Sequence, residues 1–240
     1  MKTLVTVGLC LAATLAFGAT VGSDSAANYT GDGFTNGANK GTGFQPWNIF
    51  AVGSGGTWVG DSTEGCGDIN TAGVSFGMWG NAGAGNWINC YRKFAGGALA
   101  PGQKFSINVS VNWRNGNKGF DLLANGVTIF NFNVGGDNYW WHTNVPQISL
   151  GWGWAEKRVI ACTFEQKENN VVGVTLTSGS DEFQQDLNLA GPADELKLYC
   201  GETDSGNNNN FYANSLVTIP EPAALLALLA AGLLVRARRG

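Results

Sequence analysis

A strict two-residue alternation from Lys104 to Trp113 constrains the fold of this chain most. Phe105, Ile107, Val109, Val111 and Trp113 are apolar, and the positions between them are Ser or Asn. Successive side chains of a strand point to opposite faces of a sheet. The pattern therefore predicts a half-buried strand, whereas a helix would distribute the same apolar residues all around its axis.

Turn-forming residues separate further runs of this kind. Asn125-Gly126 joins Gly119–Ala124 to Val127–Val134, and Asn-Gly between two such runs is the strongest short hairpin signal. The other expected strands are Thr57–Gly60, Val74–Trp79, Ile148–Trp154, Arg158–Gln166, Val171–Thr177, Glu195–Cys200 and Phe211–Val217.

No stretch between residues 23 and 219 has convincing helical periodicity, and many of the 36 glycines lie between the expected strands. Short strands with frequent turns and no helices are typical of two packed antiparallel sheets. We therefore expect residues 23–219 to form one all-β domain, an antiparallel β-sandwich of the jelly-roll type.

The charge distribution excludes one class of partner. Between Asp24 and Glu221, 18 acidic residues outnumber ten basic ones, which leaves a net charge of −8. Nucleic-acid binding needs a basic surface against the phosphates. We therefore expect no nucleic-acid partner for this domain.

Four cysteines remain once Cys10, which lies in the hydrophobic start of the chain, is set aside. An even number in an exported protein suggests two disulfides, and we favour Cys66–Cys90 with Cys162–Cys200. Zinc binding is an alternative, but no C-x-x-C spacing occurs. Reduced, buried cysteines are the other alternative.

The sequence gives little support for catalysis. His142 is the only histidine, and no phosphate-loop or H-E-x-x-H motif occurs. Residues 73–77 have the G-x-S-x-G spacing, but they overlap the expected strand Val74–Trp79 and no helix is expected after it, so they form no nucleophile elbow. A glycoside hydrolase needs two suitably spaced carboxylates, and the acids of this chain show no pattern of that kind. We expect no enzymatic activity and no cofactor; a glycoside hydrolase or lyase on a jelly-roll scaffold is the alternative.

Aromatic residues offer a better candidate site. Nine tryptophans are present, and one short run carries Asp137, Asn138, Tyr139, Trp140 and Trp141 after a Gly-Gly turn. Aromatic rings beside amides and carboxylates can bind a sugar ring. This run is the predicted ligand site, presented on a loop and centred on the two tryptophans; core packing is the alternative for such rings.

Acidic residues cluster in two Gly-containing segments, and calcium is the ion that hard oxygen ligands of this kind would hold. The spacing matches no EF-hand loop, and solvated turns explain the same residues. The residues concerned are Asp61, Glu64, Asp68, Asp194, Glu195, Glu202 and Asp204.

The two ends of the chain carry sorting signals. Lys2 precedes a hydrophobic stretch from Leu4 to Phe17, which predicts a signal peptide over residues 1–22. Residues 220–240 contain Pro220-Glu221-Pro222 and then an apolar run from Ala223 to Val235. As a helix this run would be about 20 Å long, against roughly 30 Å of bilayer hydrocarbon, so we expect a short membrane anchor.

The end of the chain adds three arginines, Arg236, Arg238 and Arg239, which mark the cytoplasmic side of the anchor. The order of Pro-Glu-Pro, apolar run and arginines closely resembles the PEP-CTERM sorting signal of Gram-negative bacteria. The resemblance implies that a membrane enzyme, an exosortase, reads Pro220, Glu221 and Pro222. It also implies delivery to the cell envelope or the extracellular matrix.

The domain itself resembles the β-sandwich common among PEP-CTERM cargo proteins of unassigned function. We expect an exported, envelope-directed protein with a structural or adhesive role, and the aromatic content suggests contact with extracellular polysaccharide. The resemblance rests on the order of six short motifs, which are Gly43–Trp47, Asn70–Met78, Tyr91–Phe94, Leu99–Phe105, Gly119–Leu122 and Phe211–Leu216.

Overall fold

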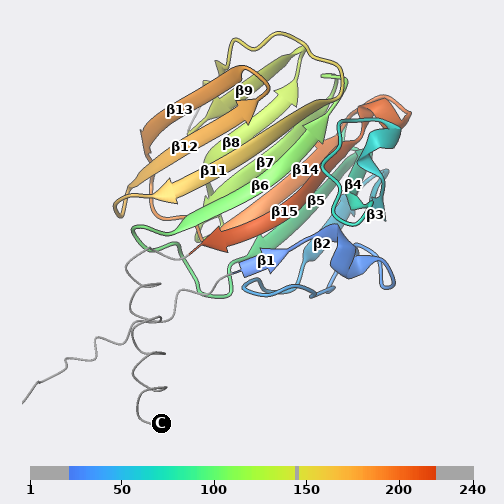
Figure 1. The fold of residues 1–240 in the computed structure, drawn as a ribbon. Coiled ribbons are helices and arrows are strands. Elements are labelled where there is room, and N and C mark those ends of the chain that lie inside the picture. The colour runs from blue at the N-terminus through green and yellow to red at the C-terminus, as the bar shows by residue number, and fades with distance from the viewer. Residues whose placement is uncertain (1–21, 144–145, 220–240) are drawn as a thin grey trace, which may run out of the picture.

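A computed structural model describes residues 22–143 and 146–219, which form a sandwich of two antiparallel sheets (Figure 1). The eight-stranded sheet runs β13 (Asp181–Asn188), β12 (Val171–Ser178), β11 (Arg158–Gln166), β6 (Lys104–Val111), β15 (Phe211–Ile219), β4 (Ser75–Gly80) and β3 (Gly55–Gly60), with β1 (Gly22–Asp24) paired to β15. The seven-stranded sheet runs β10 (Ile148–Ser149), β9 (Asn138–His142), β8 (Val127–Gly135), β7 (Asn117–Ala124), β14 (Glu195–Gly201), β5 (Trp87–Lys93) and β2 (Asn48–Val52). The helices among the described residues are the short 3-10 turns η1 (Ala26–Tyr29), η2 (Ser62–Glu64) and η3 (Asn207–Asn209).

The chain passes from one sheet to the other at successive strands. β4 lies in the eight-stranded sheet, β5 in the seven-stranded sheet, β6 in the first again and β7 in the second. The last two strands then enter the middle of the sandwich, β14 between β7 and β5 and β15 between β6 and β4. This interleaving is the jelly-roll arrangement, and the expected antiparallel sandwich is confirmed.

The predicted alternation sets the inner face of β6. Phe105, Ile107 and Val109 are buried in the space between the sheets, and the polar residues before and between them point the other way. Trp113 is an exception, because β6 ends at Val111 and the Trp113 N–H donates to the Asn208 carbonyl at 3.1 Å. Its side chain is 49% exposed.

Turn chemistry explains one prediction that held and one that was wrong. Asn125 and Gly126 both have positive φ, 51° and 78°, as the tight β7–β8 hairpin requires. The expected strand over Ile148–Trp154 stops at Ser149. Gly151, at φ +72°, turns the chain away from the sheet.

The four cysteines of the described residues carry free, buried thiols, so neither Cys66–Cys90 nor Cys162–Cys200 is bonded in this structure. Cys66 packs in a small cluster with Tyr212, away from Cys90, which lies in the main core. Cys162 and Cys200 belong to opposite sheets, and packed sheets are about 10 Å apart. Burial raises the pKa of the Cys66 thiol to about 12 and that of Cys200 to about 11, so both stay protonated at neutral pH.

The segments predicted to be sorting signals lie almost entirely outside the described residues. Only Gly22 of the predicted signal peptide is described, and the tail with Pro220, Glu221, Pro222, Arg236, Arg238 and Arg239 is not. Within residues 22–143 and 146–219, no helix has the length and apolar character needed to cross a bilayer.

Candidate functional site

The outer surface of the seven-stranded sheet carries aligned amide and aromatic side chains. In an antiparallel sheet, residues directly opposite each other project from the same face. The strand register therefore builds three rows, which are Asn48, Tyr91, Lys197, Asp121, Asn131 and His142; then Phe50, Asn89, Tyr199, Gly119, Asn133 and Trp140; then Val52, Trp87, Gly201, Asn117, Gly135 and Asn138. We call the surface formed by these rows the amide–aromatic face.

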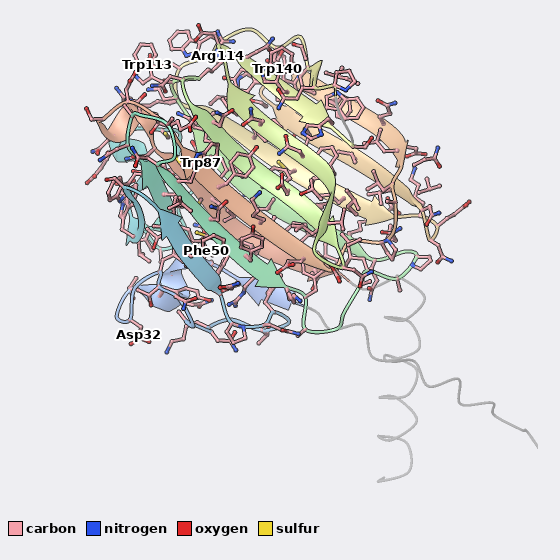
Figure 2. All side chains as sticks on the ribbon, turned by 180° about the vertical axis from the view of Figure 1, so that it is seen from behind. Asp32, Phe50, Trp87, Trp113, Arg114 and Trp140 are labelled. Atoms are coloured by element: carbon pink, nitrogen blue, oxygen red, sulfur yellow. The ribbon has the colours of Figure 1, made fainter. Side chains whose placement is uncertain are left out.

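A shallow depression of about 250 Å³ lies in this face. Figure 2 views the molecule from this side and shows Trp87 and Phe50 on the face, with Trp113, Arg114 and Trp140 along its upper rim. The depression is lined by Trp87, Asn89, Asn117, Asp121, Asn131, Asn133, His142, Gln147, Lys197 and Tyr199.

Two rings of the depression lie across glycines of the neighbouring strand. Trp87 is opposite Gly201, where an added Cβ would come within 2.3 Å of the indole. Tyr199 is opposite Gly119, where an added Cβ would lie 3.1 Å from the phenol oxygen. Because Gly201 has no side chain, the Trp87 indole can lie over it, and the Trp87 and Tyr199 ring centroids are 6.2 Å apart.

A hydrogen-bond network holds the floor of the depression. Asn131 Nδ2 donates to Asp121 Oδ1 at 2.5 Å and to the Tyr199 hydroxyl at 2.9 Å. The Tyr199 hydroxyl lies 3.0 Å from the Phe132 carbonyl oxygen and 3.1 Å from Asn133 Oδ1, so its proton has an acceptor. These side chains are buried, and the network fixes their orientation before any ligand arrives.

Two polar atoms at this site have no hydrogen-bond partner in the part of the chain that the structure describes. Asn131 Oδ1 and His142 Nδ1 are both buried without a hydrogen bond, and the two residues are opposite each other on β8 and β9. Asn131 must direct its amide nitrogen at Asp121, because a carboxylate only accepts, so its oxygen is the atom left over. An unpartnered buried polar atom costs about 1–3 kcal/mol.

The charges of the depression cancel. Lys197 Nζ lies 2.6 Å from Asp121 Oδ2, and it also stands 5.0 Å from the centre of the Tyr199 ring. Burial raises the pKa of the Tyr199 phenol well above its ordinary value, with Asp121 adding to the effect. Tyr199 is therefore a neutral hydrogen-bonding group, and the site presents dipoles and ring faces to a ligand.

The predicted ligand run is divided between two faces of β9, so the prediction of a loop site was wrong. Tyr139 is fully buried and Trp141 is 8% exposed, because both point into the core. Trp140 and Asn138 lie on the opposite side, in the amide–aromatic face, where Trp140 Nε1 donates to the Gly135 carbonyl at 2.9 Å. Asp137 is exposed in the turn before the strand, with φ 60°.

Two of the acidic residues considered for calcium stabilise turns. Asp61 accepts hydrogen bonds from the Thr63 N–H and from Asn70 Nδ2, which caps η2 and fixes the loop. Asp194 accepts from the Asn125 N–H in the β7–β8 turn. In the part of the chain that the structure describes, no group of three or more His, Cys, Asp or Glu side chains is arranged to hold a metal.

Sequence reasoning missed the strand that carries Trp87, Asn89 and Tyr91. These residues alternate with the buried Ile88 and Cys90, so the two-residue period was present as a signal. The alternation was overlooked because the outward-facing residues include two aromatic rings, so the strand does not alternate simply between polar and apolar residues.

Comparison with known proteins supplies no family. No family model and no curated sequence matches this chain. Solved structures of similar shape include the carbohydrate esterase of Shiga toxin-encoding bacteriophage phi24B, with 16% identity and a TM-score of 0.46 over 72% of this chain and 89% of that one. The receptor binding domain of a botulinum neurotoxin C/D mosaic serotype has 11% identity and a TM-score of 0.47 over 85% of this chain and 48% of that one.

A galectin of Caenorhabditis elegans has 8% identity and a TM-score of 0.38 over 52% of this chain and 86% of that one. The match to the neurotoxin domain, by contrast, covers about half of that domain's length. With TM-scores below 0.5, these likenesses establish neither a shared fold nor a shared function.

Proposed function

We propose that this protein binds polysaccharide through the amide–aromatic face. The observation that carries the proposal is the floor of the depression, where the buried amide of Asn131 is held against the Tyr199 hydroxyl and the Trp87 ring lies 6.2 Å from the Tyr199 ring. A sugar ring has an apolar face that packs on an aromatic ring, and hydroxyls that both donate and accept. The aromatic rings of the depression can pack on the apolar face of a sugar, and the amides between them can donate to and accept from its hydroxyls.

The lining favours an uncharged sugar chain. Asp121 and Lys197 are the charged residues that line the depression, and they neutralise each other at 2.6 Å. A polyanionic chain would find no free cation there. A chain of neutral sugars can extend from Trp87 across the amide rows toward Trp140, following the strands' common register.

Binding without hydrolysis fits this surface better than catalysis does. A glycoside hydrolase uses two carboxylates, about 5–9.5 Å apart, on either side of the scissile bond. The three described rows of the amide–aromatic face contain one carboxylate, Asp121, and it is engaged with Lys197, Asn131 and Thr128. We therefore propose an adhesive or structural role for the domain.

Affinity electrophoresis through gels containing starch, dextran, mixed-linkage β-glucan, xylan or mannan tests this function. We expect the protein to be retarded by at least one neutral polysaccharide. Trp87→Ala should weaken that binding about 10-fold or more, by analogy with the loss of a stacked base, which costs about 1–3 kcal/mol. Trp154→Ala is the matched control, because it removes an indole that is exposed and lies outside the depression. Retardation of Trp87→Ala equal to that of the parent, or no retardation of the parent in any gel, would contradict the proposal.

We also propose that the protein is exported and sorted at the membrane by an exosortase-type enzyme that reads Pro220-Glu221-Pro222. In the fold, Gly22 of β1 is paired with Thr218 of β15. The described chain therefore starts and ends at one place on the sandwich. Removal of a leader and processing of a tail would both act at that place and leave the amide–aromatic face intact.

Replacing Glu221 by Ala should abolish processing of the tail in a host that contains the sorting enzyme, and the full-length form should accumulate in the membrane fraction. Immunoblotting of membrane and medium fractions measures this directly. Glu202→Ala, which removes an acidic residue from the folded domain, serves as the control. Identical fractionation of the parent and Glu221→Ala would rule out Pro220-Glu221-Pro222 as a sorting signal.

A further inference from the structure

A second and larger pocket, of about 360 Å³, lies near the start of β15. It is formed by β3, β4 and the segment that leads through η3 into β15, and it is separate from the amide–aromatic face. Its volume falls within the range of roughly 300–1,000 Å³ that is usual for ligand pockets. The lining residues are Trp58, Trp79, Gly80, Asn81, Thr203, Asp204, Ser205, Gly206, Asn207 and Asn210.

The two indoles of this pocket lie flat on the outer face of the eight-stranded sheet. Trp58 is opposite Gly77, where an added Cβ would lie 2.4 Å from the indole, and Trp79 is opposite Gly56, where it would lie 2.8 Å from Nε1. The pairing of a ring with a cross-strand glycine is thus the same as at Trp87 and Tyr199. Here the two rings are diagonal neighbours on one hairpin.

The indole N–H groups of this pocket differ from those of three other tryptophans at the surface. Trp87, Trp140 and Trp154 donate to Glu202, Gly135 and Asn112, respectively. Trp58 Nε1 and Trp79 Nε1 have no acceptor among the described residues. Both side chains are half-buried, so the pocket offers two N–H donors beside two ring faces.

The opposite wall supplies complementary groups. Asp204 accepts from Asn115 through Oδ2 at 2.7 Å, and its Oδ1 has no partner in the described chain. The exposed Asn207 side chain also has no described partner. A ligand here meets donors on one side and acceptors on the other, with aromatic faces between them.

We infer that this pocket is a second, independent site for one neutral sugar unit, whose oxygens accept from Trp58 and Trp79 and whose hydroxyls donate to Asp204. It lies at the opposite end of β15 from Ile219, where the described chain ends. Nine residues at about 3.3 Å each separate the two ends by roughly 30 Å. If the tail anchors the protein, the pocket is held away from the membrane.

The test follows the indole N–H signals of the uniformly ¹⁵N-labelled protein by NMR during titration with methyl glucoside, methyl galactoside, methyl mannoside and N-acetylglucosamine. Trp58→Phe and Trp79→Phe each remove one N–H signal, which assigns them, and keep a ring over the glycine. We expect the Trp58 and Trp79 signals to shift with at least one of the four sugars. Trp79→Phe should weaken that binding about 2- to 10-fold, as the loss of one hydrogen bond does.

Asp204→Asn tests the opposite wall and should weaken binding by a similar factor, while Trp113→Ala, an exposed indole outside this pocket, should not. Trp87→Ala should leave the sugar-induced shifts of the Trp58 and Trp79 signals unchanged. The pocket and the amide–aromatic face are therefore tested separately, and a negative result at one does not contradict binding at the other. The inference fails if none of the four sugars shifts the two signals. It fails equally if Trp79→Phe and Asp204→Asn, both folded, bind like the parent.

Discussion

Replacing Asp24 by Ala is expected to lower the free energy of unfolding by about 3–5 kcal/mol. Asp24 Oδ2 lies 2.9 Å from an Arg92 guanidinium nitrogen, and both side chains are 0% exposed. Removing the carboxylate would leave the Arg92 charge buried without its counter-ion. Equilibrium unfolding in urea measures the effect.

The surroundings of this pair explain the size of the expected loss. Tyr29 donates to Asp24 at 2.7 Å, and Arg92 donates to the carbonyl oxygens of Ala38 and Lys40 and stands 5.0 Å from the Trp47 ring. Burial raises the pKa of Asp24 and lowers that of Arg92, so their contact offsets a desolvation cost that each would bear alone. The pair thereby fastens β1 and the segment up to Trp47 onto β5.

Two further variants separate this explanation from a general loss of packing. Asp32→Ala breaks an exposed ion pair with Lys40 and should leave stability unchanged. Asp24→Ala combined with Arg92→Met should be more stable than Asp24→Ala alone, because the uncompensated charge is gone. A loss below about 1 kcal/mol for Asp24→Ala, the value of an exposed pair, would refute the argument.

Trp141→Ala is expected to destabilise the domain by about 3–5 kcal/mol, as buried Trp-to-Ala replacements do. Trp141 is 8% exposed, and its ring packs on Phe183 of the other sheet, with the centroids 5.1 Å apart. The replacement would leave a cavity between β9 and β13. Thermal and urea unfolding of the variant measure the loss.

Trp140→Ala is the matched control, because it removes the same side chain from the next position of the same strand. Trp140 lies on the amide–aromatic face and is half-buried, so its loss should cost clearly less stability. If the two variants were equally stable, or if Trp141→Ala kept its stability and lost only sugar binding, the placement of Trp141 in the core would be wrong.

Local patterns in the sequence predicted much of the sandwich. The alternation around Phe105 and Val109, the turn at Asn125-Gly126 and the run Arg158–Gln166 all correspond to observed strands and turns. They could be predicted because period-two burial and positive φ depend on residues that are neighbours in the chain.

The candidate site was predicted only in part. Trp140 and Asn138 do lie on the amide–aromatic face, but Tyr139 and Trp141 do not. We expected this run to lie on a loop. Gly136 and Asp137 instead form a tight hairpin turn, with φ 55° and 60°, and β9 follows at once. A strand assignment would have separated the four residues into two faces.

The sequence by itself determined the all-β class, the positions of most turns and the two faces of several strands, because these follow from residues a few positions apart. Only the tertiary structure decided that Trp87, Tyr199 and Asn131 share one depression. Their strands are distant in sequence and meet because β14 inserts between β5 and β7. The register of these strands is set by the packing of their inner faces against the opposite sheet, so it cannot be predicted from a local sequence pattern.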